Sequence, residues 1–358
     1  MGNELMKSRK IIFVTAGMSG GGTERVIAVL ANYLSKKGCA VTILMTSRDE
    51  VAYDLEESVA VQAIGKRTGG SPIKRIKRIL DLRRYFKQEK NQVVVSFGTS
   101  TNLFSLLAHM GLPCRLIISE RNDPNQCSYP QVRNMLYRMA DALIFQTEMA
   151  RLCFPDAIAK KGSVIPNPLT GGMERSFFGT RNKDIVAVGR LEPQKNHKLL
   201  LRAFRHFSEC YPEYRLVLYG QGFLQEELRQ LAESLEIAEK VVFAGFASDV
   251  KEKIQNAAMY VLSSDFEGIS NSLMEAMALG VPVISTDCPI GGSAMLIQDK
   301  ENGLLVPVGD EQRLAEAMEF MAQDTERAEE IGKKAEYVKE AYSEKSICEK
   351  WFAEICRG

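Results

Sequence analysis

The chain has 358 residues, of which 45% are hydrophobic and 25% are charged. This length is enough for two domains, and the composition is typical of a globular protein, so a fibrous or disordered chain is excluded. The net charge of +1 hides an asymmetry, because residues 1–168 carry 24 Lys and Arg against 14 Asp and Glu, a balance of +10. The first half of the chain is therefore suited to an anionic partner.

Targeting and metal signals are missing from the sequence. No run approaches 18 apolar residues, and the first ten residues contain no hydrophobic signal core, so we expect a cytoplasmic protein. The eight cysteines never approach Cys-x-x-Cys spacing, the three histidines form no ligand pattern, and Asp-x-Asp does not occur. We expect no bound metal and no cofactor.

Strand-like runs alternate with helical segments along almost the whole chain, which predicts parallel sheets with helices on both faces. The expected strands of the first half are residues 10–15, 40–46, 59–63, 92–97, 115–119, 142–146 and 163–166. Those of the second half are residues 184–189, 214–219, 240–246, 259–263, 281–286 and 304–308.

Two turn-rich segments, 167–172 and 177–182, separate the two series of strands. The predicted fold class is α/β, with two doubly wound Rossmann-like domains facing a cleft. We expect an N-terminal domain at 1–168, a second domain at 169–340, and a C-terminal helix at 341–358 that returns to the first domain.

A glycine-rich turn, Gly20-Gly21-Gly22, follows the first expected strand and precedes a helix at 24–36. Such a turn lets backbone N–H groups approach an anion closely. It is not a dinucleotide fingerprint, because Arg25 stands where the third glycine would be needed.

Residues 71–87 form a basic amphipathic helix with Pro72 near its start. Ile73, Ile76 and Leu80 lie along one side, and Lys and Arg occupy the other. Two interpretations stay open. The apolar side packs on the domain beneath a solvated basic face, or the helix contacts anionic lipid headgroups or a diphosphate-linked acceptor.

Four polar residues, Glu120, Arg121, Asn122 and Asp123, follow another strand at the end where α/β sheets bind ligands. In the second half, Arg190 and Lys195 follow the strand at 184–189. Both can neutralise a diphosphate, which is the role that a metal has elsewhere.

The segment 265–285 is most like an active site. The buried strand at 259–263 runs into a loop, and a helix begins near Ser270 and Asn271, with an N-terminus that favours a phosphate or diphosphate. Glu275 lies on the same face of that helix and can accept hydrogen bonds from a ribose diol, while Glu267 can reach a second set of hydroxyls. Sugar, diphosphate and ribose in a row indicate a nucleotide-sugar. An ordinary amphipathic helix with two solvated glutamates is the alternative.

The spacing of Glu267 and Glu275 resembles the Glu-x7-Glu motif of retaining glycosyltransferases of family four. Residues 189–196 resemble the Gly-Arg-Leu-x-x-x-Lys-Asn element of the same family. The Ser-Glu-Arg-Asn-Asp segment at 119–123 is similar to bacterial enzymes that add N-acetylhexosamines, often N-acetylgalactosamine, to lipid-linked glycans. The family usually carries His near Glu120, so no His-based role is carried over.

The resemblance implies the glycosyltransferase-B fold and site residues of three kinds. The implied catalytic residues are Arg190, Lys195, Glu267 and Glu120. The implied donor-binding residues are Gly21, Gly22, Gly189, Arg190, Lys195, Gly220, Phe246, Glu267, Gly268, Ile269, Ser270, Asn271, Ser272, Leu273 and Glu275. The implied acceptor-binding residues are Gly20, Glu120, Arg121, Asn122 and Asp123.

The predicted function is the transfer of an N-acetylhexosamine from a UDP-sugar to a lipid-linked or polysaccharide acceptor, with retention and without a metal. Capsular polysaccharide or lipopolysaccharide synthesis is the expected setting, at the inner face of the membrane. An anionic membrane surface is an expected partner and nucleic acid is not. The alternatives are a nucleotide-sugar epimerase of the same fold and a non-catalytic partner subunit of another glycosyltransferase.

Overall fold

The computed structural model describes residues 10–47, 49–64, 71–88, 92–171, 177, 180–247 and 250–357. The chain divides into two compact units, one formed by Met1–Pro168 with Glu344–Gly358 and the other by Leu169–Ser343. The expected boundaries follow residues 168 and 340, and the contacts divide the chain after residues 168 and 343. The first nine residues and residues 172, 178 and 179 of the expected linker lie outside the described residues.

The described part of the first unit contains a sheet of parallel strands in the order β3-β2-β1-β4-β5-β6-β7. The strands are β1 (Lys10–Thr15), β2 (Ala40–Met45), β3 (Ala60–Ala63), β4 (Gln92–Phe97), β5 (Arg115–Ser119), β6 (Ala142–Phe145) and β7 (Gly162–Val164). The helices are α2 (Gly22–Lys36), α3 (Pro72–Gln88), α4 (Thr99–His109), α5 (Pro130–Tyr137), α6 (Glu148–Leu152), α7 (Asp156–Ala159) and α16 (Glu344–Cys356). Every residue of β4 is buried, as expected for a strand covered on both faces.

The second unit repeats this design with a parallel sheet in the order β10-β9-β8-β11-β12-β13 among its described residues. The strands are β8 (Asp184–Val188), β9 (Arg215–Tyr219), β10 (Val241–Gly245), β11 (Met259–Leu262), β12 (Val283–Thr286) and β13 (Leu304–Val306). The helices are α8 (His197–Cys210), α9 (Gln225–Ser234), α10 (Val250–Ile254), α11 (Asn271–Ala278), α12 (Gly292–Leu296), α13 (Glu311–Gln323), α14 (Thr325–Ala335) and α15 (Val338–Ala341). Two parallel α/β units are therefore confirmed, and each expected strand has its ends within two residues of the observed ones.

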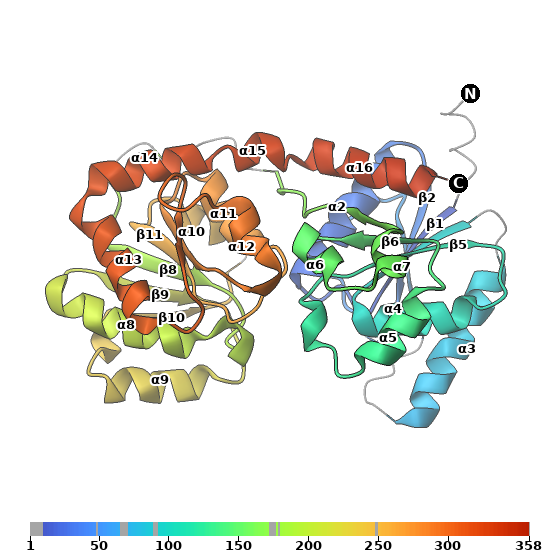
Figure 1. Cartoon of the computed structure of the whole chain (residues 1–358), viewed down its shortest axis with the longest axis horizontal. Coiled ribbons are helices and arrows are strands. Elements are labelled where there is room, and N and C mark those ends of the chain that lie inside the picture. The colour runs from blue at the N-terminus through green and yellow to red at the C-terminus, as the bar shows by residue number, and fades with distance from the viewer. Residues whose placement is uncertain are drawn as a thin grey trace. The chain divides into compact units, whose positions relative to one another are not determined.

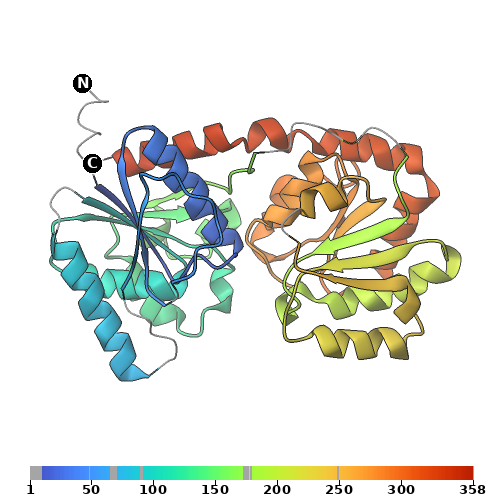
Figure 2. The ribbon, with the colours of Figure 1, turned by 180° about the vertical axis from the view of Figure 1, so that it is seen from behind.

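Helix α16 completes the core of the first unit, although it follows the whole second unit in sequence. Figures 1 and 2 show it lying against α2, on one face of the sheet. Its Trp351 is fully buried and stacks on Phe97 of β4 with ring centroids 5.6 Å apart. Ile347 and Ile355 enter the same core. The C-terminal helix is expected to return to the first domain, and its apolar face explains why it packs there.

Helix α3 packs on α4 through its second half, where Leu82 and Phe86 are buried. The apolar side chains of its first half do not pack in this way, because Ile73, Ile76 and Leu80 are 65%, 58% and 54% exposed. The interpretation in which these three residues pack on the domain is therefore wrong. They form an apolar stripe at the surface of α3, which Figure 1 labels, and exposed basic residues lie on the same helix.

Trp351 is the only tryptophan of the chain, so its fluorescence reports on the first unit. Truncating the buried Ile347 of α16 to Ala removes core contacts and leaves a cavity beside the indole. We expect Ile347→Ala to lower the free energy of unfolding, followed by tryptophan fluorescence in urea, by roughly 2–5 kcal/mol. The exposed Lys350 of the same helix supplies the control, and Lys350→Ala is expected to change the free energy of unfolding by less than about 0.5 kcal/mol. Equal effects of the two variants would contradict a packed α16.

Candidate functional site

The site of the second unit begins where β8 ends. At this point the backbone of Gly220 passes close to the carbonyl oxygen of Gly189. If Gly220 were replaced by a residue with a Cβ, that atom would lie 1.9 Å from this oxygen, and Gly220 also has a φ of +141°. A Cβ on Gly189 would lie 3.0 Å from Cε of Lys195, so the lysine side chain passes directly over this glycine. The segment after β8 thereby carries Lys195 across the end of the sheet.

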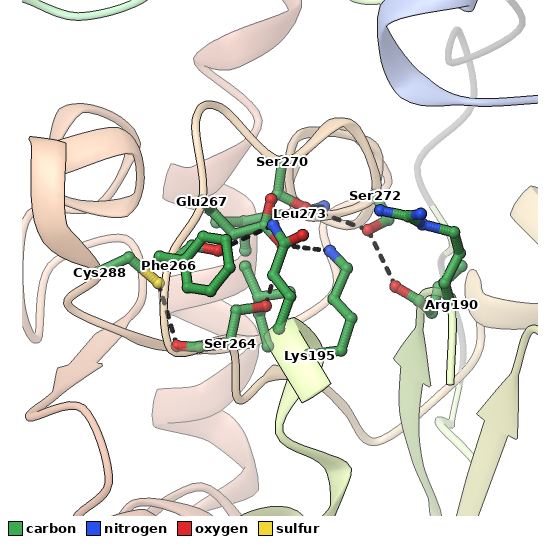
Figure 3. A network of polar contacts seen from close by, with 12 residues as sticks. Arg190, Lys195, Ser264, Phe266, Glu267, Ser270, Ser272, Leu273 and Cys288 are labelled. Atoms are coloured by element: carbon green, nitrogen blue, oxygen red, sulfur yellow. Dashed lines mark hydrogen bonds and ion pairs between the residues drawn. The ribbon is translucent and has the colours of Figure 1, made fainter. Parts of the chain in front are cut away.

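Lys195 and Glu267 form an ion pair at the carboxyl ends of β8 and β11. Their side chains are only 14% and 11% exposed. Ser264 strengthens the pair, because its hydroxyl donates to Oε1 of Glu267 at 3.0 Å, the same oxygen that Lys195 contacts. Figure 3 shows the Lys195 amino group directed at this carboxylate. A cation and a carboxylate are thus held together with little access to water.

Four hydrogen bonds join the loops that carry this ion pair. The hydroxyl of Ser263 donates to the carbonyl of Lys195 at 2.9 Å, and the amide of Asp265 donates to the carbonyl of Gln194 at 2.9 Å. The Gln194 side chain donates to the carbonyl of Phe266 at 2.9 Å, and the Asn196 side chain donates to Asp265 at 2.6 Å. Because the strand order reverses between β8 and β11, this is the position where open α/β sheets bind ligands.

Helix α11 begins beside the ion pair. Ser270 is its N-cap and accepts a hydrogen bond from the amide of Leu273 at 3.4 Å, as its sequence position predicts. Ser272 donates to the carbonyl of Val188 at 3.2 Å and accepts from the hydroxyl of Tyr260 at 2.7 Å, so the first turn is fixed to β8 and β11. The positive end of the helix dipole therefore lies next to Lys195.

The chain just before α11 is closely packed. Ile269 and Leu273 are buried, and a Cβ on Gly292 would come 1.7 Å from the carbonyl oxygen of Gly268. Gly292, at the start of α12, is therefore required for the loop to reach its position. Asn271 is partly exposed at the start of α11.

Arg190 lies at the edge of this group. Its side chain is 66% exposed and pairs with Glu192 at 2.9 Å. Figure 3 places Arg190 on the Ser272 side of the cluster, away from the Lys195–Glu267 contact. Phe246 follows β10 and is 71% exposed. Both side chains are accessible to a ligand from solvent.

The second carboxylate of the expected motif, Glu275, is 3% exposed. It accepts a hydrogen bond from Thr170 at 3.3 Å and lies 3.8 Å from Nζ of Lys251. A solvated glutamate, the alternative interpretation of this helix, does not describe either Glu267 or Glu275. The sequence gives no local signal for Thr170 or Lys251, because their contacts with Glu275 join segments far apart along the chain. Ser264 lies only three residues before Glu267, and it was not identified from the sequence.

In the first unit, the glycine-rich turn holds a carboxylate of its own chain. Gly20 and Gly21 donate their amides to Oε2 of Glu24 at 2.7 and 2.9 Å, and Gly22 begins α2. Glu24 thereby supplies one half of a capping box, since Gly21 at the N-cap has no side chain to supply the other half. The turn therefore presents amides to an anion, and the anion in this structure is Glu24.

Glu120 follows β5 and is buried at 3% exposure. It accepts hydrogen bonds from the hydroxyls of Thr99 at 2.7 Å and Tyr137 at 2.6 Å. Burial raises the pKa of Glu120, although the two hydroxyls act in the opposite direction. Burial and the adjacent Glu120 raise the pKa of Tyr137.

The three residues after Glu120 have different environments. Arg121 is 8% exposed and donates to the side chain of Asn167, and burial lowers its pKa to about 10, so it remains a cation near neutral pH. Asp123 is buried and caps the turn that follows by accepting from the amide of Asn125 at 2.9 Å. Asn122 is exposed. Solvent can therefore reach Asn122 more easily than the buried residues on either side of it.

Within the described residues, no three His, Cys, Asp or Glu side chains are grouped closely enough to hold a metal ion. The absence of a metal remains a prediction from the sequence.

His197, the first residue of α8, is a buried neighbour of Lys195 that the sequence did not mark. It is 5% exposed, and neither ring nitrogen has a well-formed hydrogen bond to the described part of the chain. Burial, and then the positive charge of Lys195, lower its pKa to about 4. His197 is therefore neutral near pH 7.

This depressed pKa makes stability depend on pH. Between pH 6.5 and about 4 the unfolded chain binds the proton and the folded protein does not, so stability falls as the pH falls through this range. The difference from the ordinary value corresponds to roughly 3 kcal/mol. We expect His197→Leu to lose about this much of the pH dependence of the unfolding free energy, measured in urea at pH 7 and pH 4.

The comparison is His206, whose side chain is 61% exposed and lies 3.0 Å from Glu311. His206→Gln is expected to change the pH dependence of the unfolding free energy less than His197→Leu does. If the unfolding free energy of His197→Leu depended on pH as strongly as that of wild type, His197 would not be a buried neutral imidazole.

Comparison with known proteins identifies the family. The model "Glycosyl transferases group 1" matches residues 173–338, and "Glycosyltransferase Family 4" matches residues 20–169. The chain is 30% identical to a Campylobacter jejuni protein over 96% of this chain and 97% of that protein. That protein is named GalNAc-alpha-(1->4)-GalNAc-alpha-(1->3)-diNAcBac-PP-undecaprenol alpha-1,4-N-acetyl-D-galactosaminyltransferase.

A second Campylobacter jejuni relative is 28% identical over 92% of this chain and 94% of its own length. It is an N-acetylgalactosamine-N,N'-diacetylbacillosaminyl-diphospho-undecaprenol 4-alpha-N-acetylgalactosaminyltransferase. The crystal structure of Anabaena HepE in complex with UDP has the same fold, with a TM-score of 0.77, 19% identity, and coverage of 97% of this chain and 99% of that one. The resemblance seen in the sequence is confirmed: the chain belongs to glycosyltransferase family 4 and has the glycosyltransferase-B fold.

Proposed function

We propose that this protein is a retaining, metal-independent glycosyltransferase that transfers an N-acetylhexosamine, N-acetylgalactosamine in the first instance, from its UDP-sugar to a hydroxyl of a lipid-linked acceptor. The observation that carries the proposal is the Lys195–Glu267 pair beside the N-terminus of α11. It offers a cation, a helix dipole and a carboxylate at one point of the sheet. The names of the two Campylobacter relatives support the sugar and the acceptor, and the UDP complex of HepE supports the nucleotide.

The proposed chemistry is stabilisation of the leaving group. The bond from the anomeric carbon to the diphosphate breaks, the acceptor oxygen bonds to the same face of that carbon, and the acceptor proton passes to a diphosphate oxygen. Lys195, Arg190 and the amides at the start of α11 take the negative charge that grows on the diphosphate. Glu267 binds sugar hydroxyls and Glu275 binds the ribose diol.

On the acceptor side we propose Gly20, Glu120, Arg121, Asn122 and Asp123. The exposed Asn122 is the residue that contacts the acceptor directly, and the buried Glu120 and Arg121 hold the strand end in place. We also propose a donor-binding role for Gly21 and Gly22, since the amides of this turn can bind an anion once Glu24 no longer occupies them.

The test is transfer from a panel of UDP-sugars to an undecaprenyl-diphosphate glycan ending in N-acetylgalactosamine, with EDTA present. We expect UDP-N-acetylgalactosamine to be the preferred donor, activity to survive chelation, and the product to have an α-anomeric signal by NMR. Loss of activity in EDTA that Mn²⁺ or Mg²⁺ restores would reveal a metal site. A UDP-sugar epimer without transfer would favour the epimerase alternative.

Two lysines near the start of α8 supply the matched variants for this assay. Lys195→Ala removes the buried cation and is expected to lower turnover by roughly 10²–10³-fold, the scale of one lost electrostatic stabiliser. Lys198→Ala removes a more exposed lysine that pairs with Glu227 and is expected to stay within a few-fold of wild type. Similar turnover in both variants would show that Lys195 does not stabilise the diphosphate leaving group.

We also propose that the protein works at the inner face of the membrane, held there by α3. No helix in the described residues has the length and apolarity needed to cross a bilayer. The exposed stripe of Ile73, Ile76 and Leu80 supports contact with lipid, because an amphipathic helix buries such a face at the bilayer surface. The basic residues exposed on the same helix are Lys74, Arg75, Lys77, Arg84 and Lys87. Each contributes about 1 kcal/mol near an anionic surface.

Flotation with liposomes tests this proposal. We expect wild type to float with liposomes containing anionic lipid and not with neutral ones, and added salt to weaken binding. Changing Lys74, Arg75 and Lys77 to Glu, or Ile73 and Ile76 to Ser, should each abolish flotation.

The charge-matched control changes Lys333, Lys334 and Lys345 to Glu, three exposed residues on other helices. This control should float like wild type. If the α3 variants also float like wild type, the helix has no role in binding lipid.

A further inference from the structure

The ribose-binding role proposed for Glu275 raises the question of what holds this carboxylate in place. Glu275 is 3% exposed, and burial of a charged group is costly unless partners compensate it. Two of its partners come from distant parts of the second unit. Thr170, just after the chain enters that unit, donates its hydroxyl to Oε1 at 3.3 Å, and Lys251 of α10 lies 3.8 Å from the same oxygen.

Lys251 also binds the chain segment that carries Thr170. Its Nζ donates to the hydroxyl of Thr170 at 3.0 Å and to the carbonyl of Gly171 at 3.0 Å. An ammonium, a hydroxyl and a carboxylate therefore form a triangle. The ammonium fixes the hydroxyl, the hydroxyl is oriented toward the carboxylate, and the positive charge lies close to both.

We infer that Lys251 and Thr170 are positioning residues for donor binding, which act on the ribose through Glu275. This inference rests on the proposed function, in which Glu275 accepts hydrogen bonds from the ribose diol. A carboxylate that is already oriented loses less side-chain entropy when the nucleotide binds. Removal of Lys251 leaves Glu275 with a weaker partner and a less defined orientation. The affinity for a ribose with both hydroxyls then falls, while uracil and diphosphate contacts are unaffected.

The experiment compares UDP with 2′,3′-dideoxy-UDP by calorimetry on the full-length protein. Wild type should bind UDP roughly tenfold or more tightly than the dideoxy analogue, the size of one charge-assisted hydrogen bond. Lys251→Met should weaken UDP binding roughly tenfold and change binding of the analogue less than about twofold. Lys251→Arg, which keeps the charge, should recover most of the affinity for UDP.

Two further variants separate this role from a structural one. Lys253→Met, two residues along α10, is the surface control and should bind both ligands like wild type. Thr170→Val keeps the shape of the side chain without the hydroxyl and should weaken only UDP, about threefold. Thermal melting shows that each variant is folded, and Thr170→Val carries the test if Lys251→Met is not.

The outcomes divide clearly. If Lys251→Met weakens the binding of UDP and of the analogue equally, Lys251 has a structural role. If the binding of both is unchanged, Lys251 has no role in donor binding. Either result overturns the inference. Failure of wild type to bind UDP would instead overturn the proposed function.

Discussion

Lys195 and Glu267 are charged groups that the second unit removes from water together, and neither side chain is more than 14% exposed. A buried charge is tolerated only beside an opposite charge with further hydrogen bonds. This constraint determines the loops around the pair. The segment after β8 and the segment after β11 are joined by hydrogen bonds from Ser263, Gln194 and Asn196, because a shift of either loop would separate the charges.

The same constraint extends into the packing of the backbone. Gly189 lets the Lys195 side chain cross the chain, and Gly292 lets the loop before α11 approach α12. Tyr260 and Ser272 then fix the first turn of α11 to the sheet. As a result, the cation and the helix N-terminus have fixed positions before any ligand binds. Fixed charges of this kind need no reorganisation when charge develops on a ligand, which is the main physical advantage of such a site.

Local patterns in the sequence were sufficient for the α/β fold, for the strand positions and for the start of α11 at Ser270. They predicted less about the environments of the site residues. The capping of Gly20 and Gly21 by Glu24 competes with a ligand for the same amides, and nothing in a glycine-rich turn distinguishes the two. Burial of Glu120 depends on Thr99 and Tyr137, which lie 21 and 17 residues away. The partners of Glu275 are 105 and 24 positions distant, beyond the reach of any helical or strand periodicity.

The place of α16 in the first unit has a consequence for the order in which the protein folds during synthesis. The second unit is continuous from Leu169 to Ser343, so all of it leaves the ribosome before α16 does. Until then, the first unit lacks Trp351, Ile347 and Ile355, and the apolar surface of α2 and β4 that they cover stays open to solvent. The first unit is synthesised earlier, but its core stays incomplete until α16, at the other end of the chain, has been made. The first unit therefore cannot be completed before the second has been synthesised, and the nascent chain exposes the unfinished core of its first unit during that whole interval.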